Sequence, residues 1–208
     1  MLLPILAFDT SAAHCAAALL LPAPQNTCRV VQRLELMEKG QAERLVPMLE
    51  EVLAEGGIGW SDLKALAVGT GPGNFTGVRI AVAAARGLAL GLGIPALGVT
   101  RLEALAFGLP RPLRVIEDAR RGEVYVQDFK EDGPGPATLA VTDTAEPLSN
   151  ATGSAAGPDA LPAAMPIAEA IARIAALRAG HPQPRPAPFY LRGADAAPPS
   201  DPPPVILP

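Results

Sequence analysis

The 208-residue chain has a net charge of −4 and a sequence pI near 5.2, which argues against unaided electrostatic binding to nucleic acid. Hydrophobic residues make up 49% of the chain and aromatic residues only 4%, so we expect a sizeable core of aliphatic and alanine side chains. Two cysteines cannot form a disulfide framework, and the two histidines match no metal-ligand spacing. The sequence therefore predicts no metal site.

The first three apolar segments are predicted to be strands. Residues 5–9 form a short apolar run that ends in Asp9-Thr10-Ser11, a polar sequence typical either of a binding site or of a simple turn. Residues 15–21 form a second apolar run that can pair with the first. In residues 29–37, apolar and polar side chains alternate, as in a strand with one solvent-exposed face. The N-terminus lacks a basic region and soon reaches an acid, so we expect no secretory signal and a cytoplasmic protein.

Residues 43–55 are predicted to form an amphipathic helix. Its apolar stripe has i, i+3, i+4 spacing and consists of Leu45, Met48, Leu49, Val52 and Leu53. Pro47 is expected in the first turn or at a bend, and Gly56-Gly57 should end the helix. Such a stripe is typical of a surface that faces the core, although a surface that binds a partner has the same pattern.

A glycine-rich stretch, Gly69–Ile80, follows a short apolar run and predicts a strand, a tight turn and a helix. Gly71 and Gly73 flank Pro72 and can adopt the positive φ of such a turn, while Asn74 or Thr76 can cap the helix. The amides of a helix N-terminus suit an anion. However, the stretch has neither the Gly-Lys-Ser/Thr of a phosphate loop nor the spacing of a dinucleotide fingerprint. A phosphate loop and a purely structural turn therefore both stay open.

The helix after this turn is unusually apolar. Between Phe75 and Leu92 its only charges are Arg79 and Arg86. We expect such a helix to be buried on every side, with one face on a sheet and another on a helix of this chain or of a second chain. Its arginines and glycines make it a poor candidate for a membrane span.

The remaining elements complete a mixed α/β arrangement. Residues 96–99 are predicted to be a strand and residues 100–107 a short helix capped by Thr100. The resulting order β-β-β-α-β-α-β-α predicts a mixed five-stranded sheet with helices on it, which is the layout of the ribonuclease-H-like half of actin-like ATPases.

A second, smaller lobe is expected after this unit. Residues 114–118 and 123–129 should form a hairpin, and residues 166–179 an alanine-rich helix. We therefore divide the chain into an N-terminal lobe (residues 1–108), a reduced second lobe (residues 109–192) and a proline-rich tail (residues 193–208) that is disordered or draped on a surface.

Four motifs in order resemble those of the TsaB (YeaZ) family. Residues 71–80 are similar to its GPGSFTGLRIG signature, and residues 118–125 to its DARxGEVY segment. Residues 8–11 are similar to its opening IDTS, and residues 188–192 to its PxYLR. Their order and spacing cover most of residues 1–192.

The resemblance implies an actin-like fold in two lobes and a role as a non-catalytic partner of the paralogous transferase subunit TsaD. With TsaD and the ATPase TsaE, such proteins help transfer a threonylcarbamoyl group to the adenosine next to the anticodon of tRNA. The implied partners are a TsaD-like paralogue, a TsaE-like ATPase and, when the chain is alone, a second copy of itself. tRNA would be met only through the complex, and no membrane is implied. No catalytic residue or resident cofactor is implied, and ATP or ADP at an interface of the complex stays open.

Two groups of residues follow from this resemblance. The implied partner interface consists of Leu45, Leu49, Val52, Phe75, Val78, Arg79, Val82 and Arg86. The implied vestigial nucleotide or phosphate site consists of Asp9, Thr10, Ser11, Gly71, Gly73, Thr76 and Asp118. The sequence departs from the family at Gln41, where members often have a histidine. It also departs from nucleotide-hydrolysing relatives, whose first phosphate loop usually contains Asp-x-Gly, because Asp9-Thr10-Ser11 has no glycine.

Two other functions are weighed against the partner role. The first is an actin-like-fold ATPase or phosphotransferase that uses Asp9 and the glycine-rich turn, with Asp118 as the second carboxylate. The second is direct tRNA binding through Arg120, Arg121 and Arg192, which the acidic total charge disfavours. The partner hypothesis predicts that Val82→Glu breaks the heterodimer while the monomer stays soluble.

Overall fold

The first three strands are linked as hairpins, and two later strands join them in one sheet. The computed structural model describes residues 3–142 and 150–192. The strands of this first sheet are β1 (Ile5–Asp9), β2 (His14–Ala23), β3 (Thr27–Leu36), β4 (Ala65–Gly69) and β5 (Ala96–Val99), with short 3₁₀ turns at η1 (Pro24–Asn26) and η2 (Trp60–Asp62). The order is β3-β2-β1-β4-β5; β1, β2 and β3 are antiparallel, and β1, β4 and β5 are parallel. The predicted mixed five-stranded sheet is confirmed.

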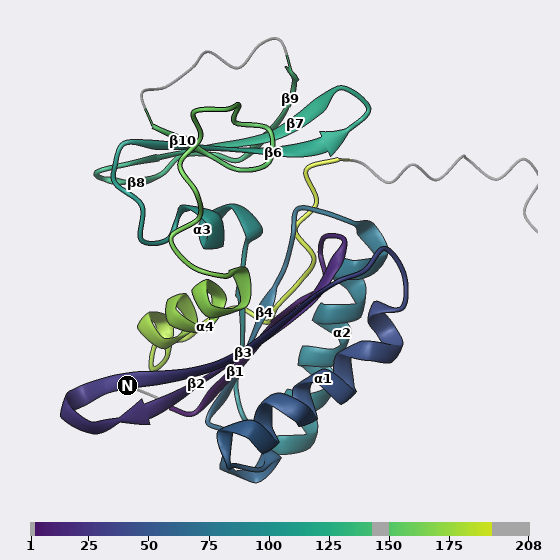
Figure 1. Cartoon of the computed structure of the whole chain (residues 1–208), viewed down its shortest axis with the longest axis vertical. Helices are drawn as coiled ribbons and strands as arrows, with labels where there is room; N and C mark the ends of the chain where they lie inside the picture. Colours follow the sequence, from purple (N-terminus) through teal and green to yellow (C-terminus); the bar gives the residue numbers. More distant parts are fainter. Residues whose placement is uncertain (1–2, 143–149, 193–208) are drawn as a thin grey trace, which may run out of the picture.

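Both faces of this sheet are covered. Helices α1 (Gln41–Gly56) and α2 (Phe75–Leu92) pack on one face and α4 (Ile167–Arg178) packs on the other (Figure 1). Along β1, Leu6 and Phe8 contact the α1 and α2 side, whereas Ile5 and Ala7 contact the α4 side. A strand buried on both faces has to be apolar throughout, which explains the uninterrupted run at the start of the sequence.

Helix α1 places its predicted stripe against the sheet. Leu45, Met48, Leu49, Val52 and Leu53 are all at most 2% exposed. The helix begins at Gln41, two residues before the predicted start, and Pro47 lies inside it instead of in the first turn. It ends at Gly57, whose φ of +75° is the left-handed conformation that favours glycine.

A second sheet forms the smaller lobe. Its strands are β6 (Leu113–Arg120), β7 (Glu123–Lys130), β8 (Gly133–Pro134), β9 (Thr138–Val141) and β10 (Ala151–Thr152). The order is β10-β6-β7-β8, with β9 also pairing with β7, and β6 and β7 form the predicted hairpin. Helix α3 (Arg101–Ala106) lies between the two sheets, where Leu102 and Ala106 join the core of the second lobe (Figure 1). Thr100 caps α3 as predicted.

The C-terminal part of the chain does not follow the expected division at residue 109. Ala170, Ile171 and Ala175 of α4 pack against Ile5 and Ala7 in the first lobe. The physical reason is that the second face of the first sheet is apolar and left open by α1 and α2, so the alanine-rich face of α4 packs closely on it. After α4 the chain runs back between the lobes (Figure 1). The predicted proline-rich tail, residues 193–208, lies outside the described residues.

Candidate functional site

The glycine-rich turn is shaped to receive another piece of backbone. A Cβ at Gly73 would lie 2.2 Å from the Ser11 carbonyl oxygen, and one at Gly77 would lie 1.9 Å from the Thr10 carbonyl oxygen. The connection that follows β1 therefore fills the turn. Gly71 has a φ of +90°, as predicted, but Gly73 is required for this close approach and not for a positive φ.

Hydrogen bonds hold the two segments together. The side-chain oxygen of Asn74 caps α2 by accepting from the Gly77 backbone N–H at 3.1 Å. The backbone N–H of Asn74 donates to the Ser11 carbonyl oxygen at 2.6 Å. The Thr10 hydroxyl donates to the Gly77 carbonyl at 2.6 Å. Of the two predicted caps, Asn74 is the one used.

These contacts correct the predicted nucleotide or phosphate site. Asp9, Thr10 and Ser11 are at most 1% exposed, and Gly71 is buried as well. Gly73, Thr76 and Asp118 are exposed, but the backbone of residues 10–11 lies in the turn where a phosphate would have to bind. The contacts therefore favour the purely structural interpretation of the glycine-rich turn. The ATPase hypothesis needs this turn to bind phosphate, and the backbone of residues 10–11 already fills it.

Asp9 lies at the centre of a buried polar cluster. Its Oδ2 is 2.7 Å from His14 Nε2, accepts from the Ser11 hydroxyl at 3.0 Å and lies 3.8 Å from Arg101 Nη1. Burial opposes ionisation of Asp9, but the His14 hydrogen bond and the charge of Arg101 hold its pKa below the usual value. Residues 9–11 thus hold the fold together at this point.

The sequence did not predict His14 in this role. His14 begins β2, an inner strand, and is 8% exposed. The sequence does contain one indication of this contact. His14 directly precedes a long apolar run and follows Asp9, the acid at the end of the first strand, by five residues.

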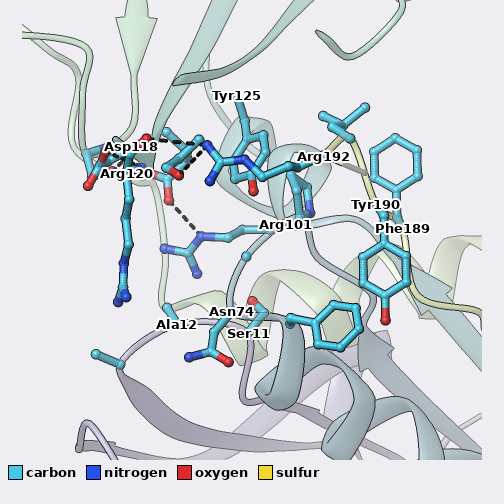
Figure 2. Close-up of a pocket in the computed structure, with 18 residues that line it drawn as sticks. Ser11, Ala12, Asn74, Arg101, Asp118, Arg120, Tyr125, Phe189, Tyr190 and Arg192 are labelled. Atoms are coloured by element: carbon cyan, nitrogen blue, oxygen red, sulfur yellow. Dashed lines mark hydrogen bonds and ion pairs between the residues drawn. The ribbon is translucent and has the colours of Figure 1, made fainter. Parts of the chain in front are cut away.

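A second buried ion pair connects the two lobes. Arg101 of α3 donates from Nε to Glu117 Oε2 of β6 at 2.7 Å (Figure 2). The other carboxylate oxygen of Glu117 accepts from the Ser154 amide at 2.7 Å. Neither Arg101 nor Glu117 stood out in the sequence, because their proximity depends on how the two lobes meet.

An open cavity of about 740 Å³ lies between the lobes beside this ion pair. The first lobe lines it with residues 11–13 and 72–75, and the second lobe with residues 117–120, Tyr125 and Ser154. Residues 189–192 close a third side (Figure 2). This cavity, called the interlobe cleft below, is open enough for a small ligand to enter.

The C-terminal segment is bound to both lobes. The Phe189 amide donates to the Thr70 carbonyl at 2.8 Å in the first lobe, and Arg192 pairs with Glu123 and donates to the Ala119 carbonyl in the second. Tyr190 stacks on Phe75 with 5.2 Å between ring centroids. Arg79 donates to the Tyr190 hydroxyl at 3.0 Å, and its guanidinium lies 3.7 Å from the centre of the Phe75 ring. Residues 189–192 therefore connect the two lobes beside the interlobe cleft.

The predicted partner interface needs correction. Leu45, Leu49, Val52, Val78 and Val82 are at most 3% exposed and form part of the core between the helices and the sheet. They cannot contact another chain, because they already pack on their own sheet. Phe75, Arg79 and Arg86, in contrast, are exposed.

Helix α2 is also less buried than expected. It has 18 residues and a mean hydropathy of 1.4, but only 33% of them are buried. Its exposed side carries Ala83, Gly87 and Leu90, the last 77% exposed. By length and composition alone the helix could cross a membrane; this is weak evidence, because the core helices of soluble proteins meet the same criterion.

Two further sequence expectations concern metal ligands and Gln41. Within residues 3–142 and 150–192, no group of three or more His, Cys, Asp or Glu side chains is placed to hold a metal ion. Gln41, at the position where relatives often have histidine, begins α1 and donates from Nε2 to the Met37 carbonyl at 3.0 Å.

Comparison with known proteins places the chain in a family. The family model of TsaD, tRNA N6-adenosine threonylcarbamoyltransferase, matches residues 35–173. Escherichia coli K12 TsaB, a tRNA threonylcarbamoyladenosine biosynthesis protein, is 40% identical over 136 residues, which are 63% of this chain and 57% of that protein. The structure of YeaZ from Pseudomonas aeruginosa has a TM-score of 0.71 and 30% identity, covering 90% of this chain and 99% of that one. The chain belongs to the TsaB (YeaZ) family.

Membership of the TsaB family agrees with the two mixed sheets, and the predicted actin-like, ribonuclease-H-like fold class is confirmed. A protein of Mycobacterium tuberculosis H37Rv is 34% identical over 192 residues, which are 84% of this chain and 90% of that protein. The chain spans little more than half the length of the curated TsaB proteins that it matches.

Proposed function

We propose that this chain is the partner subunit of a TsaD-type complex that transfers a threonylcarbamoyl group to the adenosine next to the anticodon of tRNA. In this role it performs no chemistry of its own and activates or positions a TsaD-like paralogue. A TsaE-like ATPase completes the complex, any ATP or ADP binds at a subunit interface, and tRNA is met only through the assembly. The complex works in the cytoplasm.

The observation that carries this proposal is the exposed apolar side of α2. Leu90 is 77% exposed and Phe75 is 45% exposed, while Ala83 and Gly87 leave room for another backbone to approach. On the neighbouring helix α1, Val46 is 42% exposed. We call the exposed residues Val46, Phe75, Ala83, Gly87 and Leu90 the helix-pair surface. Exposed apolar residues on two neighbouring helices favour an interaction site, and the exposed Arg79 and Arg86 lie on the same helix as Phe75 and Leu90.

The match to the TsaD family model supports a paralogue as the occupant of this surface. A paralogue of the same fold has a corresponding helix pair, so the two chains can meet about an approximate two-fold axis. When the paralogue is missing, a second copy of this chain can take its place and form an isologous homodimer.

The test compares two leucines of similar exposure on opposite faces of the first sheet. Leu90→Glu places a charge in the helix-pair surface, whereas Leu177→Glu changes a residue of α4 that is 70% exposed. Each purified variant is mixed with the TsaD-like paralogue of the same organism, and the mass is measured by light scattering on a sizing column.

We expect a one-to-one complex with the parent chain and with Leu177→Glu, and loss of that complex with Leu90→Glu. Because both leucines are exposed, neither change should unfold the monomer, and circular dichroism checks this. Equal binding by both variants would contradict the proposed surface. If even the parent chain formed no mixed species, the proposed function would be wrong.

A further inference from the structure

Several side chains that donate hydrogen bonds line the interlobe cleft. Arg101 is only 16% exposed, yet among the described residues one of its five N–H groups has an acceptor, the Nε–H that bonds to Glu117. Its Nη1 is buried and has no hydrogen-bond partner, although the Asp9 carboxylate lies 3.8 Å from it. A buried guanidinium with most of its donors unused is costly unless something else accepts from it.

Three other donors face the same space without an acceptor among the described residues. They are the guanidinium of Arg120, the hydroxyl of Tyr125 and the side-chain amide nitrogen of Asn74. Asn74 uses only its oxygen, to cap α2. Figure 2 shows Arg120 reaching from the second lobe toward the first, and Tyr125 pointing its hydroxyl toward Arg101.

Both carboxylates that line the cleft accept hydrogen bonds from neighbouring groups. Glu117 accepts from Arg101 on one oxygen and from the Ser154 amide on the other. Asp118 accepts from the Arg120 amide at 2.7 Å. The Arg120 side chain itself forms no ion pair within the described part of the chain, so its charge faces the cleft unneutralised.

We propose that the interlobe cleft binds a small molecule through a phosphate or carboxylate group that accepts from Arg101, Arg120 and the Tyr125 hydroxyl. A doubly charged or bidentate anion matches planar guanidinium groups best. The cavity of about 740 Å³ has room for more than an inorganic ion, and the aromatic side chains of Phe75 and Tyr190 provide an apolar wall for the rest of the ligand.

This site differs from the nucleotide or phosphate site that the sequence suggested. The glycine-rich turn and Asp9 take no part in it, because the backbone of residues 10–11 already packs there. The donors Arg101, Arg120 and Tyr125 lie outside the helix-pair surface on α1 and α2, and of that surface only Phe75 also borders the cleft. The proposal does not rest on the role as a TsaD partner.

The experiment is isothermal titration of the full chain with four probes at millimolar concentration. Inorganic phosphate and adenosine 5′-monophosphate present a phosphate, N-acetylthreonine presents a carboxylate, and adenosine is the neutral counterpart. We expect binding of the phosphate probes, the carboxylate probe or both, weaker binding as salt is raised, and no comparable binding of adenosine. Which anion binds more tightly identifies the headgroup.

Two variants test the named donors. Arg120→Gln should weaken anion binding about tenfold, because one charge-assisted hydrogen bond is lost. Tyr125→Phe removes a hydroxyl that has no partner within residues 3–142 and 150–192, and it should weaken binding severalfold without lowering stability. Arg185→Gln, at an exposed position outside the cleft, is the matched control and should bind like the parent chain.

The proposal is overturned if none of the anions binds the parent chain, or if adenosine binds as tightly as its monophosphate. It is also overturned if Arg120→Gln and Tyr125→Phe, shown by circular dichroism to be folded, bind the anions as tightly as Arg185→Gln does. Complex formation with the TsaD-like paralogue is measured separately, so failure here leaves the partner role untouched.

Discussion

Replacing Gly77 by alanine tests how the glycine-rich turn is used. The new Cβ would lie 1.9 Å from the Thr10 carbonyl oxygen and 3.0 Å from its carbon, and the neighbour is backbone that cannot rotate away. The end of β1 and the start of α2 would have to separate. This would stretch the hydrogen bond from the Thr10 hydroxyl to the Gly77 carbonyl, now 2.6 Å long.

The expected cost can be worked out from these contacts. Overpacking costs about 1–3 kcal/mol, and a lost hydrogen bond costs about 1 kcal/mol. Alanine regains about 1 kcal/mol relative to glycine inside a helix. The net loss of unfolding free energy is about 2 kcal/mol, which lowers the melting temperature by roughly 4–8 °C in a domain of this size.

Gly87→Ala is the matched control on the same helix. A Cβ at Gly87 meets nothing within 4 Å, so only helix propensity changes and the variant should gain up to about 1 kcal/mol. Melting curves followed by circular dichroism, with urea titrations for the free energies, compare the two. If Gly77→Ala proved as stable as Gly87→Ala, the close packing of the turn on residues 10–11 would be refuted.

Three further predictions concern the core, the buried acid and the thiols. Val82→Glu should unfold the chain, because Val82 is 3% exposed and an unpaired carboxylate would be buried; native-like circular dichroism and an unchanged urea midpoint would show the placement to be wrong. Because the pKa of Asp9 is lowered in the fold, its carboxylate adds stability above the unfolded-state pKa near 4, and this stability is lost as the pH falls through the lower folded-state pKa. Urea titrations from about pH 6 to pH 3 should therefore show a shallower loss of stability for Asp9→Asn than for the parent chain, and equal slopes would count against the Asp9 cluster. Burial raises the pKa of the Cys15 thiol to about 11, so iodoacetamide should modify the half-buried Cys28 first and Cys15 only on unfolding, as mass spectrometry would show; early modification of Cys15 would contradict its burial.

Much of the fold follows from local patterns in the sequence. The apolar runs, the stripe on α1 and the Thr100 cap predict the order and nearly the bounds of the elements in the first lobe. The destination of α4 could not be predicted, because an alanine-rich helix fits either sheet until the faces left open by other elements are known. Here the open face is the one lined by Ile5 and Ala7.

The functional residues were harder to predict for the same reason. A helical stripe shows which residues share a face, but not whether that face meets a sheet or another chain; Leu49 and Val82 proved to face the sheet. On α2, burial is uneven although the composition is apolar all round, so the exposed side could be identified only in three dimensions. Arg101 and Glu117 are 16 residues apart and meet only because α3 lies between the lobes.

The partner role is tested most directly by the mass of the mixture of this chain with the TsaD-like paralogue of the same organism. A one-to-one complex that survives Leu177→Glu and is lost with Leu90→Glu is the result we predict. A mixture that contains only the separate chains or homodimers would contradict the partner role. A complex that persists with Leu90→Glu would contradict the helix-pair surface.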